Sequence, residues 1–286
     1  MNLPTAFVSG TTQGIGLSTA RELAEAGFRV LMGCRSTRRG ELVREHLIGS
    51  TGNERIEVVP LDLGSNDSVR QCAAEVRRRT DRLDVLVNNA GMMASTRELS
   101  ADGVELSFAV NHLGPFLLTE LLLEALRASA PARIVNVASR VHLRGRLDLD
   151  RPLSEGRYRP MAAYARSKLA NVVYTLELAE RLRGSGVTVN CLHPGVVATN
   201  IFPSASRPMA LATGFAKRFM MSPEEGAATT IYLATSPEVE GISGAYFDQH
   251  RRRDEPAPAA RDPALQKRLR EFCARLTGLE AEAETT

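Results

Sequence analysis

The chain has 286 residues, of which 43% are hydrophobic and 24% are charged, and its formal net charge is +3. This composition is that of a globular protein with a sizeable core, and the small net charge gives no reason to expect a nucleic-acid partner. No apolar stretch reaches about 18 residues and no signal peptide opens the chain, so neither a membrane span nor secretion is expected.

The cysteine pattern excludes a metal centre of the usual spacing. The chain has four cysteines, at Cys34, Cys72, Cys191 and Cys273, and no two of them form a Cys-x-x-Cys pair. Isolated thiols of this kind are typical of a reducing compartment. We therefore expect a cytoplasmic protein without a bound metal.

Apolar runs alternate with amphipathic segments along the chain. Strands are predicted at 5–8, 29–32, 56–59, 85–87, 134–137, 187–190 and 245–247. Helices are predicted at about 15–26, 38–48, 65–79, 115–128, 161–183 and 223–235. This alternation predicts a single α/β domain with a doubly wound, mostly parallel seven-stranded sheet of the Rossmann type. Ligands of such sheets bind beyond the carboxyl ends of the strands.

A glycine-rich loop, Ser9-Gly10-Thr11-Thr12-Gln13-Gly14-Ile15-Gly16, joins the first strand to the first helix. Its first glycine permits a sharp turn, and the other two let the backbone approach a pyrophosphate at the helix N-terminus. A glycine-rich turn without a ligand is the alternative. The loop residues expected to bind a dinucleotide are Gly10, Thr12, Gln13, Gly14, Ile15 and Gly16.

The end of the second strand indicates which dinucleotide is bound. The strand runs into Gly33-Cys34-Arg35-Ser36-Thr37-Arg38-Arg39, which has no acidic residue to hold ribose hydroxyls. A guanidinium binds a 2′-phosphate through two parallel hydrogen bonds. We therefore predict NADP(H), with Arg35 as the first candidate for the phosphate and Arg39 as the second. A solvated arginine loop is the alternative.

A tyrosine and a lysine stand four residues apart near the start of the helix at 161–183. This spacing puts Tyr164 and Lys168 on one helix face, where the ammonium favours the phenolate and prepares an acid/base group. Ser139 ends the fifth strand and can stabilise a developing alkoxide. Asn111 precedes the Gly114-Pro115 break, where it can bend the backbone and organise a water near Lys168. Taken alone, each of these residues also has a structural explanation, as a cap, a turn former or a chance pair.

Together the order and spacing of these motifs resemble the short-chain dehydrogenase/reductase family, and most closely its retinol-dehydrogenase-like branch. The motifs span most of the chain, and they are Ser9-Gly10-x-x-x-Gly14-Ile15-Gly16, Asp62-Leu63, Asn88-Asn89-Ala90-Gly91, Asn111, Ser139, Tyr164-x-x-x-Lys168 and Pro194-Gly195 followed by Thr199.

The resemblance implies roles for these positions. Tyr164 would transfer the proton, and Lys168 would lower its pKa and hold the nicotinamide ribose. Ser139 would orient the substrate oxygen, and Asn111 would support a proton relay. The further cofactor contacts that it implies are Asp62, Leu63, Asn88, Ala90, Gly91, Pro194, Gly195, Val197 and Thr199. The family's partners are small molecules, and its members often pair through their long helices, which leaves a homo-oligomer open.

The sequence departs from the family pattern in three places. Ser9 stands where Thr is usual, and Ala138 replaces a common Ser before Ser139. We expect no N-terminal membrane anchor of the kind typical of animal retinol dehydrogenases, which weighs against a retinoid substrate and a membrane location but leaves retinoid-like carbonyls among the candidate substrates. The segment after Ser139 is longer than in minimal members, and we consider His142 in it, together with His193, either as polar pocket contacts or as capping and packing residues.

The predicted organisation follows from these assignments. Residues 1–253 form the dinucleotide-binding and catalytic domain, in which the apolar, proline-containing segment at about 200–222 is a substrate lid or a packed surface helix. Residues 254–280 form a linker and a C-terminal helix, and 281–286 a disordered tail.

The predicted function is an NADP(H)-dependent oxidoreductase that transfers a hydride between nicotinamide and an apolar carbonyl or alcohol. Two alternatives remain. One is a non-catalytic NADP(H)-binding sensor or partner-binding protein. The other is an isomerase or cyclase on the same scaffold without net redox change.

Overall fold

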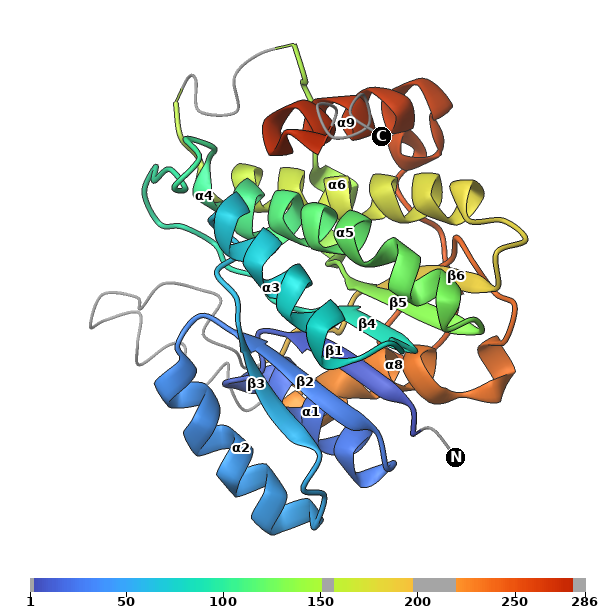
Figure 1. Cartoon of the computed structure of the whole chain (residues 1–286). Helices are drawn as coiled ribbons and strands as arrows, with labels where there is room; N and C mark the ends of the chain where they lie inside the picture. The colour runs from blue at the N-terminus through green and yellow to red at the C-terminus, as the bar shows by residue number, and fades with distance from the viewer. Residues whose placement is uncertain (1–2, 151–156, 198–219, 280–286) are drawn as a thin grey trace.

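The computed structural model of the chain describes residues 3–150, 157–197 and 220–279 (Figure 1). Most of the predicted lid at about 200–222, the whole predicted tail at 281–286 and Thr199 lie outside these residues.

The core of the molecule is one sheet with the strand order β3-β2-β1-β4-β5-β6-β7-β8. The strands are β1 (Thr5–Ser9), β2 (Arg29–Cys34), β3 (Ile56–Pro60), β4 (Val85–Asn88), β5 (Ala132–Val137), β6 (Val187–Leu192), β7 (Tyr246–Phe247) and β8 (Arg253–Asp254). The first seven are parallel, which confirms the predicted doubly wound fold. Chain order reverses at β1, where the next strand along the sheet is β4 rather than β2, and this is the switch point at which such folds bind ligands.

The prediction of seven strands was one short. The eighth strand, β8, pairs antiparallel with β7 at the edge of the sheet. It consists of two exposed, charged residues, Arg253 and Asp254. Such a pair has no apolar alternation from which a strand could be predicted.

Side chains of each strand alternate between two cores, one on each face of the sheet. On β1, Phe7 packs into one core and Ala6 and Val8 into the other. On β2, Leu31 packs into the same core as Phe7, and Val30 and Met32 pack into the other core. Because both faces are covered, the strands are apolar throughout rather than amphipathic.

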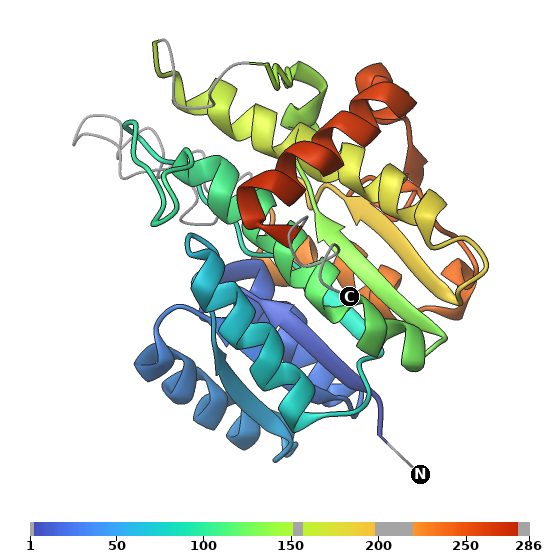
Figure 2. The same ribbon diagram turned by 45° about the horizontal axis from the view of Figure 1, so that its top comes forward.

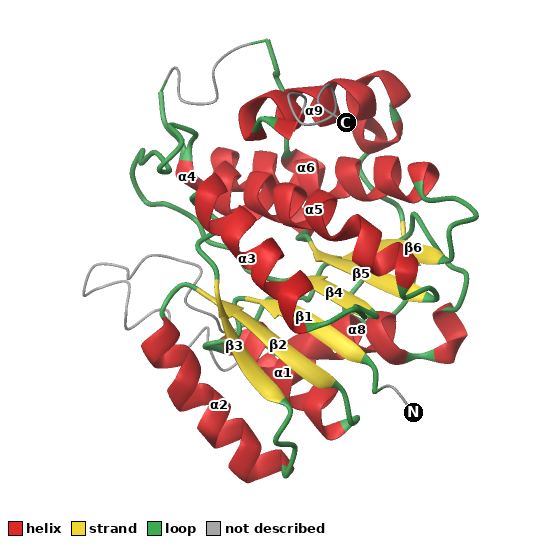
Figure 3. Ribbon diagram, in the orientation of Figure 1, coloured by secondary structure: helices red, strands yellow, loops and turns green. Residues whose placement is uncertain are grey.

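Helices cover the two faces in separate layers (Figure 3). The layer that contributes to the core around Phe7 consists of α3 (Asn66–Arg79), α5 (Gly114–Ala128) and α6 (Pro160–Arg181). The opposite layer consists of α1 (Gly14–Glu25), α2 (Thr37–Thr51) and α8 (Pro223–Thr235). The C-terminal helix α9 (Pro263–Thr277) lies outside the first layer and packs across α6 and α5 (Figure 2).

One helical segment, Leu106–Ala128, combines α4 (Leu106–Phe108), a π-helical turn (Ala109–Leu113) and α5. Among the described residues it is the one helix long and apolar enough to cross a membrane. The expectation that no segment has this length and composition was therefore wrong. Its most apolar window is 78% buried inside the protein, as in a core helix.

Candidate functional site

A cavity of about 750 Å³ opens at the carboxyl edge of the sheet. It is lined by residues that stand one or two positions after the ends of six strands, namely Gly10, Arg35, Leu61, Asn89, Ala138 and Pro194. The predicted site residues that line it are Gly10, Thr12, Gln13, Gly14, Ile15, Gly16, Arg35, Asp62, Leu63, Ala90, Gly91, Ser139, Tyr164, Lys168, Pro194, Gly195 and Val197. Motifs as far apart as residues 10 and 197 therefore meet at one place.

The glycine-rich loop forms the floor of this cavity at the start of α1. Gly10 has a φ of 75°, which favours glycine. A Cβ atom on Gly16 would lie 2.3 Å from the Gly10 carbonyl oxygen, so only glycine lets the helix approach the strand this closely. The side chain of the N-cap residue Gln13 does not cap the first turn of α1. The N–H groups and positive dipole end of that turn therefore face the cavity, which fits a pyrophosphate.

The end of β2 carries two residues that border the same cavity. Cys34 and Arg35 both line it. Arg35 is exposed and lies at the rim. Arg39 does not line the cavity. It lies exposed in the first turn of α2, where its backbone N–H donates to the capping Ser36 hydroxyl. The prediction of Arg39 as a cofactor ligand is not supported by this placement.

Tyr164 lies in the first turns of α6, with only 7% of its surface exposed. Burial raises the pKa of Tyr164 above 10.0 and outweighs the lowering effect of the Ser139 hydroxyl, which lies two residues after β5. The Lys168 Nζ is 5.8 Å from the centre of the tyrosine ring. The expected lowering of the Tyr164 pKa by the ammonium is therefore not seen, because burial dominates in this arrangement.

Lys168 is buried one turn below Tyr164 and donates a hydrogen bond of 2.8 Å to the Val137 carbonyl. Burial lowers the pKa of this lysine from 10.5 to about 8. Both predicted acid/base groups thus face one cavity, and both are shifted toward their neutral forms by loss of water.

Asn111 lies in the π-helical turn, directly behind the cavity wall. Its amide forms two hydrogen bonds with the Met92 backbone and a third, of 2.9 Å, with the Ser167 hydroxyl. A Cβ on Gly91 would lie 3.4 Å from Lys168 Nζ and 3.5 Å from the Asn111 amide oxygen, so these two groups flank Gly91. The π-helical turn is the local backbone distortion that was expected at Asn111. Such turns are frequent at functional sites.

Two further residues have positions that differ from those expected. Asn88 does not line the cavity, because its amide is buried beneath it and donates to Thr119 and Asn136. His193 is 6% exposed and accepts a 3.0 Å hydrogen bond from the Gly195 N–H, so it supports the loop rather than contacting a ligand directly.

Several lining residues were not identified from the sequence. An apolar group is formed by Met92, Val141, Met161 and Val196. Their positions beside identified residues were the available signal, since Val141 follows Ser139 by two residues and Met161 precedes Tyr164 by one helical turn. Glu98, Leu106 and Val110 come from a loop and from the π-helical segment, and no local pattern predicts that these approach the cavity.

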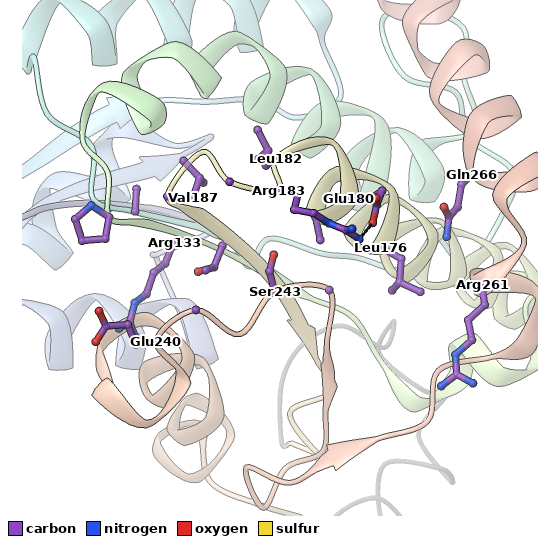
Figure 4. Close-up of a pocket in the computed structure, with 18 of the residues that line it drawn as sticks. Arg133, Leu176, Glu180, Leu182, Arg183, Val187, Glu240, Ser243, Arg261 and Gln266 are labelled. Carbon is purple, nitrogen blue, oxygen red and sulfur yellow. Dashed lines mark hydrogen bonds and ion pairs between the residues drawn. The ribbon is translucent and has the colours of Figure 1, made fainter.

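A second cavity, of about 1,090 Å³, lies at the opposite edge of the sheet, at the amino ends of β5 and β6 (Figure 4). Its three arginines already have polar partners. Arg183 pairs with Glu180, Arg261 pairs with Glu255, and Arg133 donates to two backbone carbonyls at the end of α8. None of the predicted site residues within the described ranges lines it. We assign the site to the cavity at the carboxyl edge, although the other is larger.

The family model described as short chain dehydrogenase matches residues 4–210, which is most of the chain and includes every predicted site residue. The chain belongs to the short-chain dehydrogenase family. Human retinol dehydrogenase 13 is 43% identical over 284 residues, which cover 97% of this chain and 85% of that protein. This places the chain in the retinol-dehydrogenase-like branch of the family, as its motifs predict.

Solved structures give the same assignment for the fold of this short-chain dehydrogenase. A protein from Mycobacterium paratuberculosis superimposes with a TM-score of 0.77 at 32% identity, covering 97% of this chain and 96% of that one. The Pseudomonas aeruginosa RhlG complex with NADP has a TM-score of 0.67 at 29% identity, with 86% and 94% covered. The family therefore supplies a nicotinamide-dependent oxidoreductase scaffold.

Proposed function

We propose that this short-chain dehydrogenase is an NADP(H)-dependent oxidoreductase that interconverts an apolar carbonyl compound and its alcohol. The observation that carries the proposal is the Tyr164 phenol, which shares a cavity wall with Ser139 and lies one turn from Lys168, above a floor formed by a glycine-rich helix N-terminus. We assign the catalytic set to Tyr164, Ser139 and Lys168, with Asn111 as a positioning residue.

Bound nicotinamide supplies the hydride. In the reducing direction the Tyr164 hydroxyl donates its proton to the substrate oxygen as the carbonyl becomes an alkoxide. Ser139 donates a hydrogen bond to the same oxygen and stabilises its developing charge. The Lys168 ammonium stabilises the phenolate that Tyr164 leaves behind. Asn111 holds Met92 and Ser167 in place beside these groups.

NADP(H) is the preferred cofactor in this proposal because of the residues at the end of β2. Arg35 borders the cavity where the strand ends, and no acidic residue stands at that position to repel a 2′-phosphate. The NADP complex of the related RhlG protein agrees with this choice.

The substrate in this proposal is apolar because part of the cavity wall is apolar. Met92, Val141, Met161 and Val196 line the same cavity as Tyr164, and they offer no charge to pair with an anionic substrate. The relatives named retinol dehydrogenases support a bulky apolar alcohol or carbonyl of this kind. The free, buried state of all four cysteines supports a reducing, cytoplasmic location.

The purified protein, incubated with NADPH or NADH and a panel of apolar aldehydes and ketones, tests the proposal. We expect NADPH oxidation with formation of an equal amount of alcohol, and a lower rate with NADH. Tight cofactor binding without turnover of any carbonyl would contradict the proposal, as would product formation without net NADPH consumption.

A further inference from the structure

Two buried histidines connect the C-terminal part of the chain to the proposed active site. His142 and His112 are 0% and 1% exposed, and neither lines the cavity. The suggestion that His142 contacts a substrate is therefore wrong. Each imidazole instead bonds to the segment Glu255–Thr277, which lies beyond the region 4–210 matched by the family model.

The first connection runs from the C-terminal segment to Ser139 through His142. The backbone N–H of Ala257 donates to His142 Nε2 at 3.1 Å. Because an amide N–H can only donate, Nε2 must be the unprotonated nitrogen of the ring. The proton is then on Nδ1, which donates to the Ser139 carbonyl oxygen at 2.8 Å. The neutral ring is further fixed by Tyr246, whose ring centre is 4.7 Å away.

The second connection runs from α9 to the π-helical turn. His112 directly follows Asn111, and its Nδ1 is 3.0 Å from the Asn171 side-chain oxygen on α6. That contact requires a proton on Nδ1, so Nε2 accepts from the Cys273 thiol at 3.4 Å. Burial keeps Cys273 in its thiol form, which is the form that can donate. The ring therefore joins α9 to the helix that carries Lys168 and to the turn that carries Asn111.

We propose that the C-terminal segment Glu255–Thr277 positions the active site through these two neutral imidazoles, with His142 as a positioning residue for Ser139 and His112 for Asn111 and Lys168. The inference rests on the proposed function. Its physical basis is that a group displaced by about 1 Å can lose a hundredfold in rate while the protein remains folded. The C-terminal helix α9 then contributes to the geometry of the active site, in addition to packing on α6.

Two histidine variants separate the two bonds of the first connection. In His142→Asn the amide nitrogen takes the place of Nδ1 and keeps donating to Ser139, but the bond from Ala257 is lost. In His142→Gln the amide oxygen takes the place of Nε2 and keeps accepting from Ala257, but the bond to Ser139 is lost. His46→Asn, on the exposed face of α2, is the matched control.

We expect both His142 variants to lower kcat about tenfold or more, with the KM for the carbonyl and the Kd for NADPH nearly unchanged. The control should retain full activity. A His142→Asn variant with the wild-type kcat would overturn the link to the C-terminal segment. A loss of kcat that is matched by an equal loss of NADPH affinity would also overturn it, because that pattern indicates general disruption.

The second connection is tested by Cys273→Ala and Cys273→Ser. Serine retains a donor to His112 Nε2 and alanine does not, so serine should restore most of the kcat lost in the alanine variant. Equal kcat values for alanine and wild type would refute this arm.

Amide hydrogen exchange tests the coupling without using turnover, and so separates it from a failure of the proposed function. In His142→Asn, exchange should accelerate at 139–145 as well as at 257–262, whereas His46→Asn should leave both unchanged. Unchanged exchange at 139–145 would overturn the coupling even if the enzyme assignment holds.

Discussion

Tyr164 and Lys168 lie on the same buried wall, and loss of water shifts their pKa values in opposite directions. Burial raises the pKa of the phenol above 10.0 and lowers the pKa of the ammonium to about 8. At neutral pH the pair is therefore a protonated phenol beside a protonated amine. This is the state required for Tyr164 to act as the acid in carbonyl reduction.

The lowered pKa of Lys168 predicts a pH dependence. The charged form is present below about 8 and is lost as the pH rises through that value, so the kcat/KM for carbonyl reduction should fall above it. Lys168→Arg keeps its charge over this range and should show lower activity but no such decline. A wild-type profile that remains flat well above pH 8 would contradict this role for the lysine.

Arg35 is predicted to set the cofactor preference. Arg35→Ala should weaken NADPH binding about 10- to 100-fold, the value of charge-assisted hydrogen bonds to a phosphate, and should leave NADH binding nearly unchanged. Arg38→Ala, an exposed residue that does not line the cavity, is the matched control. Fluorescence titration with both cofactors measures the effect, and equal losses for NADPH and NADH would contradict it.

At the scale of elements, the sequence predicted what depends on local pattern. The seven parallel strands were predicted because each is a buried apolar run, and the glycine loop because its glycines stand between a strand and a helix, where a Cβ on Gly16 would lie 2.3 Å from the Gly10 carbonyl oxygen. The strand β8 was missed because Arg253 and Asp254 pair only through the backbone. Asn88 was misplaced because a strand-end side chain can point into the cavity or beneath it, and its partner Thr119 is 31 residues away.

Buried His112, in the π-helical turn, makes the free energy of unfolding depend on pH. Burial lowers the pKa of this histidine from 6.5 to about 4. The unfolded chain therefore binds a proton that the folded protein does not, and stability falls as the pH falls from 6.5 toward 4. When the pH falls from about 7 to about 5, protonation of His112 in the unfolded chain should lower the free energy of unfolding by about 2 kcal/mol.

Urea unfolding at these two pH values measures the contribution. His112→Gln should be less stable than wild type near neutrality, since it loses a buried packing partner, and it should lose less stability on acidification. The exposed His46→Gln should keep the wild-type dependence. If His112→Gln shows the same acid sensitivity as wild type, the buried histidine is not its source.

At the scale of the whole molecule, the cavity is assembled from both halves of the chain. The loops after β1, β2 and β3 meet the loops after β4, β5 and β6 across the switch in strand order. The sequence predicted this meeting because parallel strands present their carboxyl ends at one edge. It did not predict the walls from Glu98, Leu106 and Val110, since their approach depends on the path of a loop and on a π-helical turn rather than on local periodicity.

A cofactor that bridges the two halves should stabilise the whole fold. At a concentration of about 100 times its Kd, NADP(H) should add about 2.7 kcal/mol and raise the Tm by about 5–10 °C. The same excess of NADH relative to its own Kd should give a similar shift, which serves as the control. No shift with either cofactor would contradict a dinucleotide site in this cavity.

The role of Tyr164 as proton donor is tested most directly by the kcat of Tyr164→Phe, compared with wild type at saturating NADPH and carbonyl substrate. We expect a loss of kcat of roughly 10²- to 10⁴-fold, because the phenol is the proton donor, with NADPH affinity nearly unchanged. A variant that binds NADPH normally and keeps more than about a tenth of the wild-type kcat would contradict the assignment of Tyr164 and the mechanism that depends on it.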